Sequence, residues 1–310
     1  MAKEQSQSLV DILATAAAGG GKQLLSPQEM IQNLQGQGYQ IIKKDPLRQT
    51  LPYKIDATWA ERAKGIKTLR FGVVSDTHLG SQKQQLTFLN QFYDKCEGLG
   101  IKDIFHGGDL FDGDGSVYRG QQYDLFKFGA DAQLDYGIVN YPHRKGITTH
   151  VVAGNHDWSF WKRGGFDILS RLSGARPDIK YLGSTAAVVI YGGLKIQVTH
   201  GSGGGTYARS YRLQRLIENF TPENKPEIFL LGNFHNWAQV PMVRNVNGWQ
   251  LGCFQAQTDF EKSKGLFPEI GGLIIEIDVN DLTKRGERPI GQIAFRQEIV
   301  PFYVPKSHDW

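Results

Sequence analysis

The stretch T-H-V-V-A-G-N-H-D at residues 149–157 decides how the rest of the chain is interpreted. Its first five residues form an apolar run typical of a buried strand, and the run ends in glycine, asparagine, histidine and aspartate. By itself this is an ordinary strand ending in a turn, because Gly, Asn and Asp tolerate the backbone angles of turns. The stretch becomes informative because other parts of the chain repeat its pattern.

Four further apolar runs end in aspartate, asparagine or histidine. They are V-V-S-D-T-H at 73–78, I-F-H-G-G-D-L-F-D at 104–112, I-Q-V-T-H at 196–200 and I-F-L-L-G-N-F-H at 228–235. In a sheet covered by helices, strands are continuous apolar runs, and ligands bind beyond their carboxyl ends. The five strand ends are therefore predicted to meet in one crevice.

The side chains at these strand ends are carboxylates, amides and imidazoles, with no thiolate among them. Such donors suit Mn, Fe, Zn or Mg, and an oxygen-rich mixed set fits a hydrolytic site with two metals. The order D-x-H, G-D-x-x-D, G-N-H-D, lone H and G-x-x-H resembles the calcineurin-like metallophosphoesterase family, over roughly residues 69–278. The resemblance implies an α/β fold, a layered sandwich of two mixed β-sheets flanked by helices.

The resemblance also implies a set of metal ligands. Asp76 and His78 are expected to hold the first metal, since side chains two residues apart in a strand point the same way. Asp109 is expected to bridge both ions. The other implied ligands are Asn155 and His200 for the second metal and His235 for the first. The expected cofactor is two divalent metal ions, with Mn favoured over Mg, Fe or Zn.

One position departs from the family pattern. The family usually ends in G-H-x-H, and the first of those histidines is replaced here by Asn233. An amide oxygen can ligate a hard metal but is a poorer donor than imidazole. Asn233 is therefore a further candidate ligand, and we expect the second ion to be weakly bound, selective for Mn or Mg, or exchangeable.

His156 resembles the catalytic histidine of the family and is not expected to be a ligand. In a two-metal hydrolysis the departing oxygen needs a proton or a hydrogen bond, which His156 is expected to supply. Asp112 resembles the carboxylate that hydrogen-bonds this histidine and raises its pKa. The alternative is that Asp112 is a turn-forming residue before Gly113.

Composition describes a globular protein. The chain has 310 residues, 40% hydrophobic and 21% charged, and its net charge of +4 permits a polyanionic partner. Cys96 and Cys253 are isolated thiols, so we expect no disulfide framework and a cytoplasmic location. No apolar stretch is long enough to span a membrane, and Asp11 interrupts the apolar residues 9–18, so we expect neither a membrane partner nor a signal peptide. Nothing in the sequence specifies an oligomeric state.

Three segments are predicted. Residues 1–66 form a small N-terminal α/β appendage of helix, helix and strand with a linker, in which S-P-Q-E at 26–29 is a capping box. This appendage is either an arm packed on the catalytic domain or a small helix-turn-helix-like module with basic residues at Lys43, Lys44 and Arg48. Residues 67–280 form the catalytic domain, and residues 281–310 form a C-terminal strand and tail packed on it.

Within the catalytic domain, alternating patterns predict further elements. Helices are expected at 84–99 and 123–137, and a hairpin at 186–199. Strands at 272–278 and 292–301 are expected to form a second sheet packed on the first.

Two stretches are candidate substrate-binding segments. Trp158 and Trp161 belong to the stretch W-S-F-W-K-R at 158–163, where aromatic and basic residues stand together, a composition suited to stacking on bases beside a nucleic-acid backbone. Arg209 and Arg212 come after the glycine-rich residues 201–205 and are placed to grip phosphates. The alternatives are that the aromatic residues close a core and that the arginines form a solvated helix face.

The motifs and composition are compatible with three functions. The favoured one is a metal-dependent phosphodiesterase that hydrolyses DNA or RNA through metal-activated water, similar to the SbcD-like nuclease branch of the family. The second is a phosphatase for a phosphoprotein or small phosphomonoester, which G-D-x-x-D favours and the lack of arginine at position 113 disfavours. The third is a metal-impaired nucleic-acid-binding or scaffold subunit, which only Asn233 suggests.

Overall fold

The structure is a computed structural model that describes residues 52–63, 66–204, 206–280 and 293–310. All of them belong to the second of the two units into which the chain divides, Asp45–Trp310. The predicted helix, helix and strand of the N-terminal appendage therefore lie outside the described residues. None of the described helices has the length and apolar character needed to cross a membrane.

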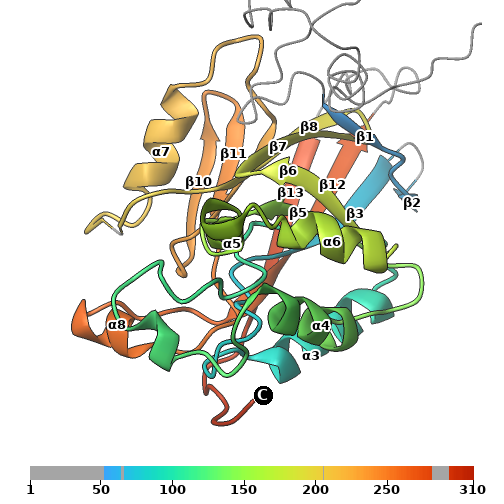
Figure 1. The fold of residues 1–310 in the computed structure, drawn as a ribbon. Coiled ribbons are helices and arrows are strands. Elements are labelled where there is room, and N and C mark those ends of the chain that lie inside the picture. The colour runs from blue at the N-terminus through green and yellow to red at the C-terminus, as the bar shows by residue number, and fades with distance from the viewer. Residues whose placement is uncertain (1–51, 64–65, 205, 281–292) are drawn as a thin grey trace, which may run out of the picture. The chain divides into compact units, whose positions relative to one another are not determined.

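The described residues form two mixed β-sheets (Figure 1). The first sheet has the order β13-β12-β3-β4-β5-β6, with β2 paired to β3, and the second has the order β1-β7-β8-β9-β11-β10. The strands are β1 (Tyr53–Ile55), β2 (Trp59–Ala63), β3 (Ile66–Val74), β4 (Asp103–His106), β5 (Thr148–Ala153), β6 (Ile179–Ser184), β7 (Ala186–Tyr191), β8 (Leu194–His200), β9 (Ile228–Gly232), β10 (Ala238–Val243), β11 (Val246–Gln250), β12 (Gly271–Asn280) and β13 (Ile293–Pro301). Two mixed sheets flanked by helices confirm the predicted fold class.

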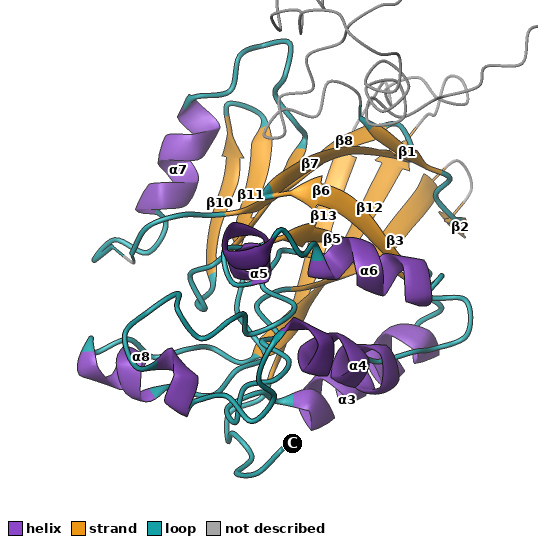
Figure 2. Ribbon diagram, viewed as in Figure 1, coloured by secondary structure: helices purple, strands orange, loops and turns teal. Residues whose placement is uncertain are grey.

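Figure 2 shows the helices and strands that form the layers of the fold. Three apolar clusters separate these layers. One lies between the two sheets, one between the first sheet and its helices, and one between the second sheet and α7. The helices are α3 (Leu86–Gly98), α4 (Ala130–Asn140), α5 (Asp157–Gly164), α6 (Ile168–Ala175), α7 (Tyr211–Glu218) and α8 (Asp259–Ser263). The order of layers is helices, first sheet, second sheet and helix.

Strand β9 shows why the apolar runs are continuous. Ile228 and Leu230 belong to the cluster between the sheets, whereas Phe229 and Leu231 belong to the cluster beneath α7. All five residues of the strand are buried. A strand covered on both faces has no polar alternation, and this signal located β9 correctly in the sequence.

The strands predicted to build a second sheet at 272–278 and 292–301 extend the first sheet instead, so that prediction was wrong. β12 pairs antiparallel with β3, with Leu273 opposite Val73, and β13 pairs with the other edge of β12. The second sheet is built around the hairpin of β7 and β8, which the sequence predicted. Periodicity identifies a strand but not its neighbour, which depends on long-range packing.

The helix expected at 123–137 begins later than predicted. Residues Gln121–Tyr123 form a short 3-10 turn, and α4 starts only at Ala130. Gly129, the residue before α4, has a φ of 85°, outside the right-handed helical region. The chain therefore cannot continue as one helix through this glycine.

The C-terminal tail supplies a cap for α3. The residue before this helix, Gln85, makes no side-chain cap, and the first turn contains no acidic residue. The Asp309 carboxylate instead accepts hydrogen bonds from the Thr87 amide, at 2.7 Å, and from the Thr87 hydroxyl. Trp310 stacks on Phe126 with ring centroids 5.1 Å apart. The tail thus pairs an amide that helix geometry leaves without a partner.

Asp309→Ala is expected to lower the free energy of unfolding by about 1 kcal/mol, the usual cost of losing a helix cap. Urea denaturation measures this change. Asp309→Asn keeps an acceptor oxygen and is expected to lose less. Equal stability of the alanine variant and the original protein would show that the tail does not cap α3.

Candidate metal centre

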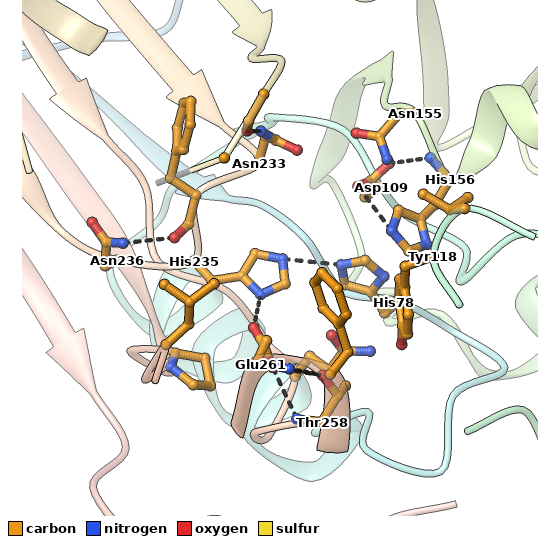
Figure 3. Close-up of a pocket in the computed structure, with 18 of the residues that line it drawn as sticks. His78, Asp109, Tyr118, Asn155, His156, Asn233, His235, Asn236, Thr258 and Glu261 are labelled. Atoms are coloured by element: carbon orange, nitrogen blue, oxygen red, sulfur yellow. Dashed lines mark hydrogen bonds and ion pairs between the residues drawn. The ribbon is translucent and has the colours of Figure 1, made fainter. Parts of the chain in front are cut away.

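The candidate ligands lie where five strands end, three in the first sheet and two in the second. Figure 3 shows part of this site, including His78, Asp109 and His235. Asp76 and His78 come after β3, Asp109 after β4, Asn155 and His156 after β5, His200 ends β8, and Asn233 and His235 come after β9. The strands of both sheets end at one site, where Nε2 of His200 lies 3.1 Å from Oδ1 of Asn155. The structure therefore brings together side chains that the sequence separates by more than 150 residues.

Three overlapping groups of side chains have the geometry of a metal site. They are Asp76, His78 and His235; Asp76, Asp109 and His200; and His78, Asp109 and His156. In each group one potential ligand atom per residue lies within 4.8 Å of the others. Because Asp76 and Asp109 share the second group, the groups form one continuous centre.

At the first metal position, lone pairs of His78, His235 and Asp76 face one another. His78 donates from Nδ1 to the Asp112 carboxylate at 2.9 Å, and His235 donates from Nδ1 to Glu261 at 2.8 Å. In these neutral tautomers each Nε2 presents a lone pair, and the two Nε2 atoms are 3.2 Å apart. Oδ1 of Asp76, which is buried without a hydrogen-bond donor among the described residues, lies 3.2 Å from Nε2 of His235.

The second position repeats this arrangement. His200 donates from Nδ1 to the main-chain oxygen of Gly107 at 2.8 Å, so its Nε2 also presents a lone pair. This Nε2 lies 3.1 Å from Oδ2 of Asp109 and 3.1 Å from Oδ1 of Asn155. Buried lone pairs that face one another repel unless a cation lies between them. The donor sets at both positions therefore fit divalent metal ions held by mixed oxygen and nitrogen ligands.

A proton supplies this positive charge when no metal is bound. Burial lowers the pKa of His200, but the adjacent Asp109 carboxylate outweighs burial and raises this pKa to about 9. Burial also opposes protonation of His235, yet its contacts with Asp76 and Glu261 hold its pKa well above the usual range. His78 differs, because burial dominates and lowers its pKa to about 4.

Metal binding at neutral pH is therefore expected to release about one proton or more per protein, because metal ligands must be unprotonated imidazoles. The apparent affinity for Mn²⁺ should rise with pH and level off near pH 9, where His200 loses its proton. Calorimetric titration in buffers of different ionisation enthalpy counts the released protons. Identical heats in all buffers would contradict the assignment.

The backbone at the centre is held in an uncommon conformation. Five of the candidate ligands have positive φ angles: Asp76 (51°), His78 (47°), Asp109 (52°), Asn233 (85°) and His235 (54°). Such a conformation costs about 1 kcal/mol or more for each residue, least for Asp, Asn and His. Strained backbone of this kind concentrates at functional sites because surrounding structure must maintain it.

The loops after β4 and β5 are locked to each other by Asp157 and Gly154. The buried Asp157 carboxylate accepts hydrogen bonds from the amides of Phe111 at 2.8 Å, Gly154 at 2.9 Å and Leu110 at 3.2 Å. A Cβ atom at Gly154 would overlap the Asp109 carboxylate. Glycine at this position therefore lets the two loops approach closely enough to place Asp109 beside Asn155.

His156 and Asp112 are arranged differently from the prediction. The main-chain oxygen of Asp112 accepts a hydrogen bond from Nδ1 of His156 at 2.7 Å, whereas the carboxylate is 3.7 Å away and pairs with His78. The pKa of His156 was predicted to rise, but burial lowers it. Burial also raises the pKa of Asp112 to about 7. The Asp112 side chain thus orients a candidate ligand, and its backbone orients His156.

Glu261 orients His235, a role that was not predicted from the sequence. One carboxylate oxygen of Glu261 accepts from Nδ1 of His235, and the other accepts from the amide of Thr258 at 2.9 Å. Thr258 and Glu261 form a reciprocal capping box at the start of α8. The pattern T-D-F-E at 258–261 was the available sequence signal. A carboxylate behind a metal-binding histidine fixes its tautomer and raises its basicity.

Glu261→Gln is expected to weaken Mn²⁺ binding at the first position by about 10–100-fold, the usual cost of losing such a partner. Calorimetry on the metal-free protein measures this affinity. Thr258→Ala is the matched control, because it removes the cap but keeps the contact between Glu261 and His235. It is expected to cost about 1 kcal/mol of stability with a smaller change in affinity. Equal affinities in all three proteins would remove Glu261 from the metal centre.

Asn233 lies beside the centre but its side chain is engaged elsewhere (Figure 3). Its amide nitrogen donates to the main-chain oxygen of Gly203 at 3.3 Å. Its backbone amide donates to Oδ2 of Asp76 at 3.0 Å. The residue thus positions Asp76 through its backbone, and its role as a ligand stays a prediction.

A cavity of about 430 Å³ opens over the ligand atoms (Figure 3). It is lined by His78, Asp109, Val117, Tyr118, Asn155, His156, Ser202, Gly203, Gly204, Asn233, Phe234, His235, Asn236, Gln255, Thr258, Phe260, Glu261, Leu266, Phe267 and Pro268. Apart from the candidate ligands and Glu261, these residues are uncharged. The cavity is therefore polar at its metal-binding side and largely apolar around it.

The four predicted substrate residues do not line this cavity. Trp158 and Trp161 stack on each other with ring centroids 5.6 Å apart, because residues three apart share one face of α5. Arg209 forms an ion pair with Glu269 at 2.6 Å, and Arg212 lies beside Gly203. The prediction for the tryptophans rested on composition, which does not say where their side chains lie.

A sequence model of one known family matches the part of the chain that carries these ligands. The model is described as calcineurin-like phosphoesterase, and it matches residues 69–262, which is more than half of the chain. The chain belongs to the calcineurin-like phosphoesterase family. The resemblance predicted from the motifs is thereby confirmed, and it supports phosphoester hydrolysis as the general activity.

Several solved structures are similar to the chain. Vps29 from Entamoeba histolytica, solved in complex with zinc, is 14% identical with a TM-score of 0.35, covering 74% of this chain and 98% of its own. The Thermotoga maritima protein TM1076 is 15% identical with a TM-score of 0.33, covering 74% and 99%. Vps29 from Chaetomium thermophilum is 12% identical with a TM-score of 0.37, covering 75% and 98%. No curated protein matches the sequence.

Proposed function

We propose that this protein is a phosphodiesterase that hydrolyses nucleic acid with two divalent metal ions, Mn being the metal of choice. The family supports phosphoester hydrolysis in general. The observation that favours a diester is the lining of the cavity, which contains no lysine or arginine among the described residues. A phosphomonoester carries a second negative charge that such a lining leaves without a partner, whereas a phosphodiester carries only one.

The protein's own residues have separate tasks in this proposal. Asp76, His78 and His235 would hold an ion at the first position, while Asn155 and His200 would hold one at the second. Bound there, divalent ions would supply an activated water molecule and neutralise charge on the phosphoryl oxygens. Asp109 joins the two positions, and its own geometry is fixed by the His156 amide, which donates to Oδ1 at 2.8 Å.

His156 serves the leaving group. The hydrogen bond from its Nδ1 to the Asp112 carbonyl directs the ring, so that Nε2 lies 4.0 Å from Oδ2 of Asp109 and the residue lines the cavity. Burial lowers the pKa of this imidazole, and an anionic phosphate bound beside it favours the protonated form. His156 is then placed to donate a proton to the departing oxygen.

Two substitutions separate the role of His156 from that of the ligands. Asp109→Asn and His156→Ala are each expected to lower the Mn²⁺-dependent hydrolysis of bis-p-nitrophenyl phosphate at least about 100-fold. Only Asp109→Asn is expected to weaken metal binding, because His156 acts on the leaving group. Activity assays combined with calorimetry and circular dichroism measure turnover, metal affinity and folding. Unchanged turnover in folded Asp109→Asn, or lost metal in His156→Ala, would refute the corresponding role.

The choice of substrates tests the proposal against its alternatives. Faster hydrolysis of p-nitrophenyl phosphate than of bis-p-nitrophenyl phosphate or single-stranded DNA would favour a phosphomonoesterase. No Mn²⁺-dependent turnover of any of these substrates would favour a binding or scaffold subunit.

A further inference from the structure

A second hollow adjoins the cavity over the metal ligands. Its volume is about 340 Å³, and its lining consists of Asp114, Ser116, Val117, Asn155, Ser159, Lys162 and Arg163. Val117 and Asn155 line both spaces. The two spaces therefore meet at Asn155, a candidate ligand of the second metal.

The second hollow differs from the cavity in the charges of the residues that line it. Nε of Arg163 pairs with the Asp114 carboxylate at 2.7 Å, which neutralises both charges. Lys162 has no ion-pair partner among the described residues, and it is exposed at the hollow. Two cations and one carboxylate leave one net positive charge there, a suitable place for an anionic group of a ligand.

Of these two spaces, only the cavity over the metal ligands has aromatic rings among the described residues that line it. Tyr118 stacks on Phe260 with ring centroids 4.6 Å apart and an angle of 24° between the planes. Phe267 is 72% exposed and lines the same cavity. An exposed ring beside a phosphate-binding centre offers a surface on which a nucleic-acid base can stack.

One space has aromatic rings in its lining and the other has a net positive charge. We infer that together they form one binding site for an oligonucleotide, an inference that rests on the proposed function. The phosphate to be cleaved lies at the metal ligands, a base lies against Phe260 and Phe267, and the neighbouring phosphate lies at Lys162. Lys162 thus replaces Arg209 and Arg212 as the phosphate-binding residue, and Phe267 replaces Trp158 and Trp161 as the stacking residue. The preferred substrate then has a second phosphate beside the scissile one.

Three thymidine substrates test the phosphate position in the full-length protein with Mn²⁺. TpT has one phosphate, and pTpT and TpTp carry a second phosphate on one side or the other. We expect the internal bond of one phosphorylated form to be cleaved with a kcat/KM about tenfold above that of TpT, as one added ionic contact allows. In Lys162→Ala this ratio should fall close to one. Lys102→Ala, an exposed lysine just before β4, is the control and should keep the ratio.

Phe267→Ala tests the base position. Loss of a stacking ring is expected to raise the KM for TpT about tenfold. Phe128→Ala is the matched control, because Phe128 is 63% exposed and lines neither space.

The outcomes separate this inference from the proposed function. A ratio of one in the original protein, or a ratio that survives Lys162→Ala, would overturn the phosphate position. An unchanged KM in Phe267→Ala would overturn the base position. In both cases the original protein still hydrolyses bis-p-nitrophenyl phosphate, whereas its failure to do so would overturn the proposed function itself.

Discussion

The mutual repulsion of buried lone pairs is the constraint on which the centre depends. The Nε2 atoms of His200 and His235 face carboxylate or amide oxygens at 3.1–3.2 Å, and the Nε2 of His78 faces that of His235 at 3.2 Å. The other nitrogen of each ring is already committed to an acceptor. This geometry persists only with positive charge inside it, as a metal ion or as protons. The left-handed backbone of the ligand-bearing loops adds strain to the same place. The apolar layers and the interlocked loops must together offset both costs.

The centre also depends on how the two sheets pack. Asn155 comes from the first sheet and His200 from the second, so any sliding of the sheets changes the distance between them. Apolar contacts alone resist sliding weakly because they have no direction. A buried polar link adds direction, since Asp103 accepts hydrogen bonds from His150 at 2.8 Å and from Tyr191 of the other sheet at 3.0 Å. His150, which matches no motif, thus has a structural role.

The five strands that end at the candidate ligands, and the ligands themselves, could be predicted from the sequence because both leave short-range signals. An apolar run ending in Asp, Asn or His marks a buried strand together with the polar residues at its carboxyl end, as at 228–235. The assignment of β12 to a sheet could not be predicted in this way, because strand pairing is decided by contacts far apart in the sequence. The roles of Glu261 and Asp112 were also beyond local patterns, since each depends on which histidine a loop happens to approach. Trp158 and Trp161 had a suitable composition but line neither of the two spaces beside the candidate ligands.

Glu261 connects the candidate metal centre to helix α8. Its two oxygens connect His235 to the first turn of α8. This helix carries Phe260, which stacks on Tyr118 in the lining of the cavity. Glu261 therefore ties the position of a candidate metal ligand to the position of a helix that lines the cavity. A displacement of α8 would also displace His235, because one carboxylate holds both.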